Sequence, residues 1–186
     1  MTSNRAGRLI GAVGAAALGV FAVLAARRAK RVAGKVVVAL HGDWEGQLKS
    51  EHRAVRRMLK AMVETEVGDA AKRSALVQEL GDALTRHAVE EENVVYPALR
   101  NLGLVDQTQA LTQDHADMKM MLRLLEEFGP EDPTWETRAK ALKRLVERHI
   151  RVEEKDAFPR LHTAPAVGGN EKITRLVRRE GAKVTG

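Results

Sequence analysis

The chain has 186 residues, a formal net charge of +6 and no cysteine. Without thiols it can form neither disulfides nor iron–sulfur clusters nor thiolate zinc sites, and a reducing compartment is compatible with this composition. Aromatic residues make up only 3% of the sequence, which favours helices, because strands are usually built from β-branched and aromatic side chains. The positive charge is concentrated before residue 40 and in the last 15 residues. This distribution argues against nucleic acid as a partner of the folded part.

An uncharged stretch at residues 9–26 lies between a basic N-terminus at 1–8 and a basic segment at 27–44. Its length is close to the ~20 residues that a helix needs to cross a bilayer. The cluster of arginines and lysine at 27–31 holds the following part of the chain in the cytoplasm by the positive-inside rule. The sequence therefore predicts a single transmembrane helix, a juxtamembrane connector and a location in the inner (cytoplasmic) membrane, with the C-terminal domain in the cytoplasm.

Two other interpretations of this stretch stay open. A secretory signal peptide would be cleaved after Ala25, and the mature protein would then begin outside the cytoplasm. A helix that lies on the membrane surface, or a soluble one, would not cross the bilayer at all. The basic cluster opposes export, and an anionic membrane surface is one partner that both basic flanks fit.

Four amphipathic segments follow, each with apolar side chains at steps of three or four residues. We expect helices at 45–66, 70–101, 106–128 and 134–161. Four helices joined by short loops pack as an up-down-up-down bundle. The predicted fold is therefore all-α, with a four-helix bundle at 45–162. Residues 163–186 are expected to form a basic tail with a short helix at 171–180.

The second and fourth predicted helices carry the same motif. It reads His-x-x-x-Glu-Glu-x-x-x-Tyr/Phe-Pro, and it runs once from His87 to Pro97 and again from His149 to Pro159. Each copy is preceded by a further acidic residue and histidine, Glu51-His52 and Asp114-His115, at distances of 35 and 34 residues between the histidines. We interpret the two prolines as helix ends, because proline lacks a backbone N–H.

The repeated motif predicts a metal site. Residues four apart share a helix face, so each motif histidine points the same way as the first glutamate after it. Apolar residues one turn before and after these pairs indicate that the shared face points into the core. An unpaired carboxylate buried there costs on the order of several kcal/mol. Ion pairs with the histidines would reduce this cost, but enclosed cations account for it better, and imidazole with carboxylate suits iron, manganese or zinc. The predicted metal ligands are His52, His87, Glu91, His115, His149 and Glu153.

Other polar residues near the motifs are expected to lie outside this set. Glu90, Glu92 and Glu154 are turned away from the inward face by the ~100° step of the helix, so we expect them to be solvated or hydrogen-bonded to a ligand. His41 and His162 fall outside the repeat and are not assigned to the site.

These residues resemble the hemerythrin-like family, the HHE cation-binding domain, over about 45–162. The resemblance rests on the two repeated motifs together with His52 and His115. It implies a four-helix bundle that holds a non-haem di-iron centre. It also implies that Glu91 and Glu153 bridge the two iron ions, with the four histidines as terminal ligands; manganese or zinc is the less favoured alternative.

Two positions depart from the family pattern. Oxygen-carrying hemerythrins have a second histidine four residues after that of the third helix, and this chain has Lys119 there. Some bacterial relatives have a glutamate four residues after the first histidine, and this chain has Arg56 there. The site would then have six protein ligands, one iron would be open to a small ligand, and simple reversible oxygen carriage becomes doubtful.

The site and the resemblance together predict a membrane-anchored di-iron protein that binds or senses O₂, peroxide, NO or iron itself. Two alternatives stay open. The first is a di-iron enzyme that consumes peroxide or O₂ in a catalase- or oxidase-like reaction, and the second is a structural bundle that holds zinc. No residue is assigned a catalytic role.

Overall fold

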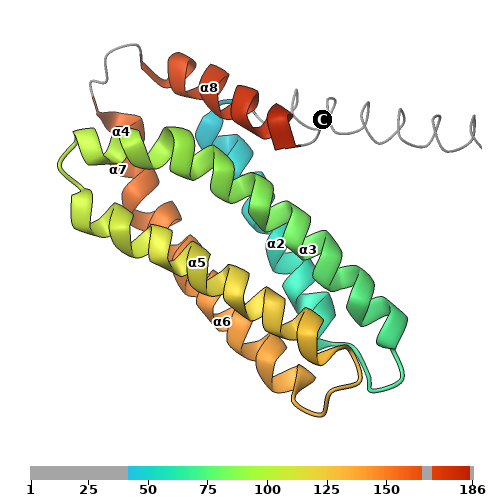
Figure 1. Cartoon of the computed structure of the whole chain (residues 1–186). Helices are drawn as coiled ribbons and strands as arrows, with labels where there is room; N and C mark the ends of the chain where they lie inside the picture. The colour runs from blue at the N-terminus through green and yellow to red at the C-terminus, as the bar shows by residue number, and fades with distance from the viewer. Residues whose placement is uncertain (1–41, 165–168, 185–186) are drawn as a thin grey trace, which may run out of the picture. The chain divides into compact units, whose positions relative to one another are not determined.

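The computed structural model describes residues 42–164 and 169–184 (Figure 1). The transmembrane helix predicted at 9–26 and the connector up to residue 41 lie outside the described residues. Within the described ranges, no helix combines the length and the apolar character that a bilayer crossing requires.

The described part is all-helical, as the composition predicts, and its long helices run side by side (Figure 1). The elements in chain order are α2 (Trp44–Val63), α3 (Ala70–Glu90), η1 (Glu91–Val95), α4 (Tyr96–Asn101), α5 (Val105–Phe128), α6 (Trp135–Val152), η2 (Glu153–Ala157), α7 (Phe158–Thr163) and α8 (Gly169–Val184). Helix α2 packs against α3 and α6, and α5 packs against α6 and α3. The four predicted bundle helices are therefore present, with boundaries within a few residues of those expected.

The helix ends follow ordinary chemistry. The side chain of Asp43 caps α2 by accepting a hydrogen bond of 3.0 Å from the backbone N–H of Gly46. Helix α5 ends at Phe128 and is followed by Gly129, whose φ of +81° is strained for residues that carry a Cβ atom.

Two apolar clusters form the core, and the predicted ligands lie between them. Along α2, Val55 belongs to the first core cluster and Leu48 to the second, and the buried His52 lies between these two residues. Along α5, Leu111 and Met118 flank His115 in the same way. The histidines thus form a polar layer that crosses the bundle, closed on both sides by apolar side chains.

The prolines do not end the helices where we expect. Each of the two motifs contains a short π-helix, η1 and η2, directly before the tyrosine or phenylalanine. In this turn the backbone N–H of Tyr96 donates to the carbonyl of Glu91, five residues earlier. Pro97 then falls in the first turn of α4, where its missing N–H costs little, and the helix continues to Asn101.

The π-turns also decide which side chains face the core. Residues five apart are brought together by the i→i+5 bonding of a π-turn, whereas in an α-helix they would diverge. Tyr96 therefore follows Glu91 on the inward face, and both side chains are fully buried. The same arrangement in η2 places Phe158 behind Glu153.

The basic tail predicted at 163–186 needs correction. In its place, helix α8 is longer than the expected 171–180 and packs on the bundle against α2, α3 and η1. Ile173 and Val177 are buried in the second core cluster, and the N–H of Trp44 donates to Thr174 Oγ1 at 3.0 Å. The segment has only a few apolar residues, spaced four apart, among many basic ones, so the sequence did not indicate a helix that packs on the bundle.

Candidate metal centre

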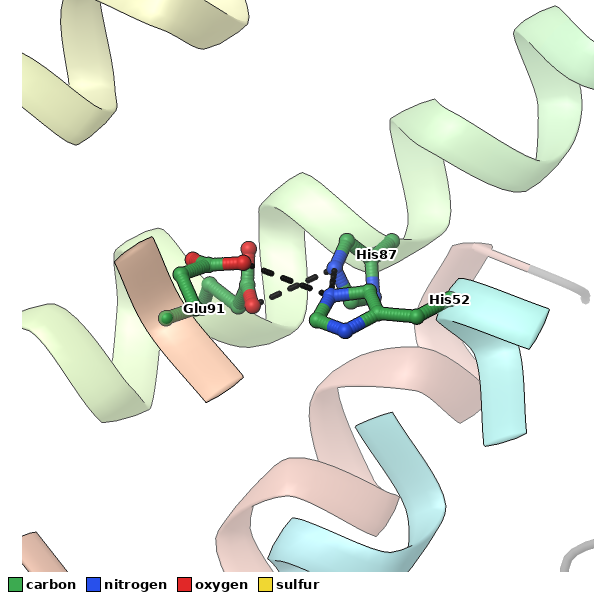
Figure 2. Close-up of side chains that lie close together, drawn as sticks. His52, His87 and Glu91 are labelled. Atoms are coloured by element: carbon green, nitrogen blue, oxygen red, sulfur yellow. Dashed lines mark hydrogen bonds and ion pairs between the residues drawn. The ribbon is translucent and has the colours of Figure 1, made fainter. Parts of the chain in front are cut away.

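The first group of predicted ligands joins the two halves of the bundle. His52 on α2 and His87 on α3 point toward one another, and Glu91 approaches them from the next turn (Figure 2). The two Nε2 atoms are 2.9 Å apart, and His87 Nε2 lies 3.2 Å from Glu91 Oε1. Glu153 completes the group, with its Oε2 atom 3.3 Å from His52 Nε2.

A second group repeats this arrangement with the other two histidines. The Nε2 atoms of His115 on α5 and His149 on α6 are 3.1 Å apart. His115 Nε2 lies 3.3 Å from Glu91 Oε2, and His149 Nε2 lies 3.2 Å from Glu153 Oε2. Both glutamates therefore belong to both groups. The structure brings all six predicted ligands together, in two sets of four that share their carboxylates.

A carboxylate also approaches the outer nitrogen of each of the four candidate ligand histidines. Nδ1 of His52 donates to Glu154 at 2.9 Å. Two further hydrogen bonds follow the same plan, His87 Nδ1 with Glu51 at 2.9 Å and His115 Nδ1 with Glu92 at 2.7 Å. The Nδ1 atom of His149 lies farther from its carboxylate, at 3.5 Å from Asp114, and makes no hydrogen bond among the described residues. An ionised carboxylate only accepts hydrogen bonds, so these three bonds place the proton on Nδ1 of His52, His87 and His115 and direct their Nε2 lone pairs inward.

The residues present fit a pair of cations. In the first group the Nε2 lone pairs of His52 and His87 face one another at 2.9 Å, which is unfavourable unless a cation or proton lies between them. Glu91 Oε1 and Glu153 Oε2 are buried oxygens without a hydrogen-bond donor among the described residues, and such atoms are costly to leave unsatisfied. Imidazole nitrogen and carboxylate oxygen without thiolate suit iron, manganese or zinc.

Protons can take the place of the cations when no metal is bound. Burial by itself lowers the pKa of His149, but the carboxylates of Glu153 and Asp114 outweigh burial and raise that pKa to about 10. His87 behaves alike, and the charges of Glu91 and Glu51 hold its pKa well above the ordinary value. Metal ions and protons therefore compete for the same nitrogens.

Tyr96 is a site residue that the sequence reasoning did not assign. Its hydroxyl donates to Glu153 Oε1 at 2.7 Å and lies 3.3 Å from Glu91 Oε2. The equivalent residue in the second motif is Phe158, which stacks on His52 and has no hydroxyl. The signal was present in the sequence, because tyrosine and phenylalanine occupy the same position of the repeat. The two groups of ligands are therefore not equivalent.

The three outer glutamates of the motifs divide into two kinds. Glu92 and Glu154 each hydrogen-bond to a ligand histidine, which is one of the two arrangements expected for them. Arg56 also binds Glu154, through both terminal nitrogens at 3.3 Å. Arg56, at the position where some relatives carry a glutamate, thus holds the carboxylate that orients His52. Burial by itself raises the pKa of Glu154. The hydrogen bonds from His52 and Arg56 outweigh burial and lower this pKa to about 2.

Glu90 is neither solvated nor bonded to a predicted ligand, contrary to expectation. It is only 1% exposed, and Gln47 Nε2 donates to its Oε2 atom at 3.1 Å. Its carboxyl group lies against Gly181 of α8, where an added Cβ would come within 1.8 Å of Oε1. Burial, with the neighbouring charge of Glu51, raises its pKa to about 8. Glu90 therefore packs α8 on α3, and the glycine permits this close approach.

The histidines excluded on sequence grounds are not part of either group. His162 lies near the start of α2, with Nδ1 2.7 Å from Glu45 Oε2. His41 falls outside the described residues.

The bundle residues of this chain match known proteins. The family model of the hemerythrin HHE cation-binding domain matches residues 46–161. A crystal structure of a hemerythrin HHE cation-binding domain-containing protein from Mycobacterium kansasii has a TM-score of 0.66 to this chain, with 22% identity over 77% of this chain and 88% of that one. A DNA nickase from Nostoc sp. (strain PCC 7120) is 35% identical over 75 residues, which are 40% of this chain and 21% of the nickase. The chain thus matches about a fifth of the length of that relative.

Proposed function

Because this chain belongs to the hemerythrin HHE cation-binding domain family, we propose that it is a non-haem di-iron protein that binds or senses O₂, peroxide, NO or iron itself. The observation that carries the proposal is the pair of buried histidine groups that share Glu91 and Glu153. Each group would hold one iron ion, and the two carboxylates would bridge the ions.

The chain's own residues have separate tasks in this proposal. The histidines offer Nε2 inward, and the outer carboxylates fix their tautomers and ring orientations. Tyr96 holds Glu153 in place through the hydrogen bond to Oε1. The two apolar clusters exclude bulk water from the layer. A bound pair of iron ions would supply a redox-active centre to which a small ligand can bind.

Six ligands leave coordination positions free in a di-iron centre. Lys119 stands where oxygen carriers have a further histidine, and the described residues place no other histidine in either group. With iron in the site, these free positions would allow an external ligand to bind, whereas the four groups of each set would complete the tetrahedral shell of a structural zinc ion.

The test of the proposal is the metal content and optical spectrum of the full chain purified in air. We expect about two irons per chain, from the carboxylate-bridged bundle geometry, and near-ultraviolet and visible bands that change on adding azide or NO. Rapid turnover of peroxide by the iron-loaded protein would favour the enzyme alternative. Stoichiometric zinc without iron would contradict the proposal and favour a structural bundle.

We also propose that residues 9–26 anchor the protein in the inner membrane with the metal domain in the cytoplasm. The support is the length of the uncharged stretch and the basic cluster behind it. The full chain should stay in the membrane fraction after a high-salt wash, because salt weakens surface electrostatic attachment but not a membrane span. Deleting residues 1–40 should release a protein that still binds iron. Release of the full chain by salt alone would contradict a membrane span.

A further inference from the structure

Charge is distributed unevenly over the four long helices of the bundle. Helices α2 and α6 together contain eleven lysines and arginines against four acidic residues, whereas α3 and α5 together contain five against eight. In the bundle α2 packs against α6, and α5 packs against α3. The bundle therefore has a basic side, made by α2 and α6, opposite a side with a net acidic charge, made by α3 and α5.

Exposed cations form a stripe along each helix of the basic side. The stripes consist of Arg53, Arg57 and Lys60 on α2 and of Lys140, Arg144 and Arg151 on α6, all six exposed. Within each helix these residues follow one another at steps of three, four or seven, which places them on one face. The buried residues Leu59 on α2 and Leu142 on α6 belong to the core cluster that lies inside. We call these six cations the α2–α6 basic face.

The arginines of this face have no acidic partner. Arg53, Arg57, Arg144 and Arg151 make no ion pair with any residue that the structure describes. Helix α8 is also basic, but two of its cations bond to its own glutamate and a third donates to the backbone carbonyl just before α2. The arginines of the α2–α6 basic face are therefore available to an external anion.

The composition of this face suits an anionic membrane surface better than a nucleic acid. Helices α2 and α6 have 20 and 18 residues, so each is about 30 Å long at ~1.5 Å per residue. Their aromatic residues, Trp44 and Trp135, are both buried, so in these two helices no aromatic ring is exposed to stack on bases. Lipid headgroups attract lysine and arginine by charge alone. The basic cluster at 27–31, ahead of α2 in the chain, has the same sign.

We propose that the α2–α6 basic face binds an anionic membrane surface, so that the bundle lies along the lipid headgroups with its α3–α5 side turned away. The attachment of this face depends on charge and needs neither iron nor a membrane span. The part of the inference that places the face on the cytoplasmic leaflet rests on the anchor proposed above for residues 9–26. Salt should weaken the attachment, because ions screen exposed charges.

Acetylation of native lysines tests this orientation. The full chain is reconstituted with vesicles of phosphatidylcholine alone or of phosphatidylcholine mixed with phosphatidylglycerol, and mass spectrometry follows the reaction of each lysine. Lys60 and Lys140 should react several-fold more slowly on the anionic vesicles. Lys72 and Lys119, which are exposed on α3 and α5, should react equally on both kinds of vesicle. High salt should restore the reactivity of the two face lysines.

Replacing Arg53 and Arg57 by glutamine removes two of the unpaired charges. Each cation near an anionic surface contributes a factor of about five to binding, so this double variant should bind through the face about 25-fold more weakly. The protection of both face lysines should then be lost. The matched control, Arg100→Gln with Arg123→Gln, removes two exposed charges from α4 and α5 and should keep that protection.

Three outcomes would overturn the inference. Equal acetylation of Lys60 and Lys140 on both kinds of vesicle would mean that the face does not bind anionic lipid. Equal protection of all four lysines would mean that the bundle has no preferred side. Displacement of the face from anionic vesicles by a DNA duplex that protects the same two lysines would assign the face to nucleic acid.

The proposed anchor fails by a different result. Extraction of the full chain by high salt would contradict a membrane span, but Lys60 and Lys140 would still be protected on anionic vesicles at low salt. A chain without iron that shows this protection would contradict only the proposed metal function.

Discussion

Replacing Glu91 by alanine is expected to lower bound iron from about two ions per chain to well below one, on the geometry of carboxylate-bridged sites. The reason is that Glu91 serves both groups. Its Oε1 atom lies 3.2 Å from His87 Nε2, and its Oε2 atom lies 3.3 Å from His115 Nε2. Without it each group keeps two imidazoles and a single carboxylate oxygen, and both sites weaken together. The measurement is metal analysis of the purified variant.

Matched variants separate a lost ligand from a damaged fold. His162→Ala removes a histidine that contacts Glu45 outside both groups, so it should keep the full metal content. His87→Ala should lower the metal content, with its stronger effect on the group that contains His52. Circular dichroism of each variant monitors the fold. Full iron loading of a folded Glu91→Ala protein would remove this residue from the site.

The six candidate ligands could be found in the sequence because two regularities coincide. Four-residue spacing puts His87 and Glu91 on one face of a helix, and the repeat places His149 and Glu153 in the same relation. The structure adds that the two glutamates lie between the histidine pairs, which follows from the meeting of helices that are distant in sequence. Spacing within a helix predicts which side chains share a face, and helix packing decides which of them meet.

The orienting carboxylates show where sequence reasoning stops. Glu51 lies next to His52 in the chain, but its carboxylate bonds to His87 on the neighbouring helix. The side chains of adjacent residues on a helix point in directions about 100° apart, so the residue next to a ligand faces a different neighbouring helix. The repeated acid-histidine pair was visible in the sequence, but its partner could only be identified once the packing of α2 on α3 was known.

The π-turns and α8 were missed for different physical reasons. A π-turn inserts one residue into a helix without changing its composition, so no periodic pattern reveals it; the only local sign was the proline that follows it. Helix α8 was misjudged because its buried face is narrow, with Ile173 and Val177 among many basic residues. One contact that attaches it is between Glu90 and Gly181, two residues that give no pairing signal in sequence.

Removing the metal should destabilise the protein strongly, and the loss should grow as pH rises from about 6.5 toward 9. In the metal-free state the pKa of His149 is about 10, whereas the ordinary value is 6.5. A raised pKa gives stability that is complete below about pH 6.5 and disappears as pH rises through about 10. The metal-free protein should therefore melt at a lower temperature at pH 9 than at pH 7.

The metal-loaded protein should respond in the opposite direction, because metal ligands must be deprotonated. Rising pH removes the competing protons, so metal binding adds more stability by mass action. In acid the histidines take up protons, the metal leaves, and the two melting temperatures should converge. The measurement is thermal unfolding of loaded and metal-free protein at several pH values in this range. Equal melting temperatures for both forms at pH 8 would mean that the buried cluster is satisfied by its own ion pairs, and the metal assignment would then fail on stability grounds.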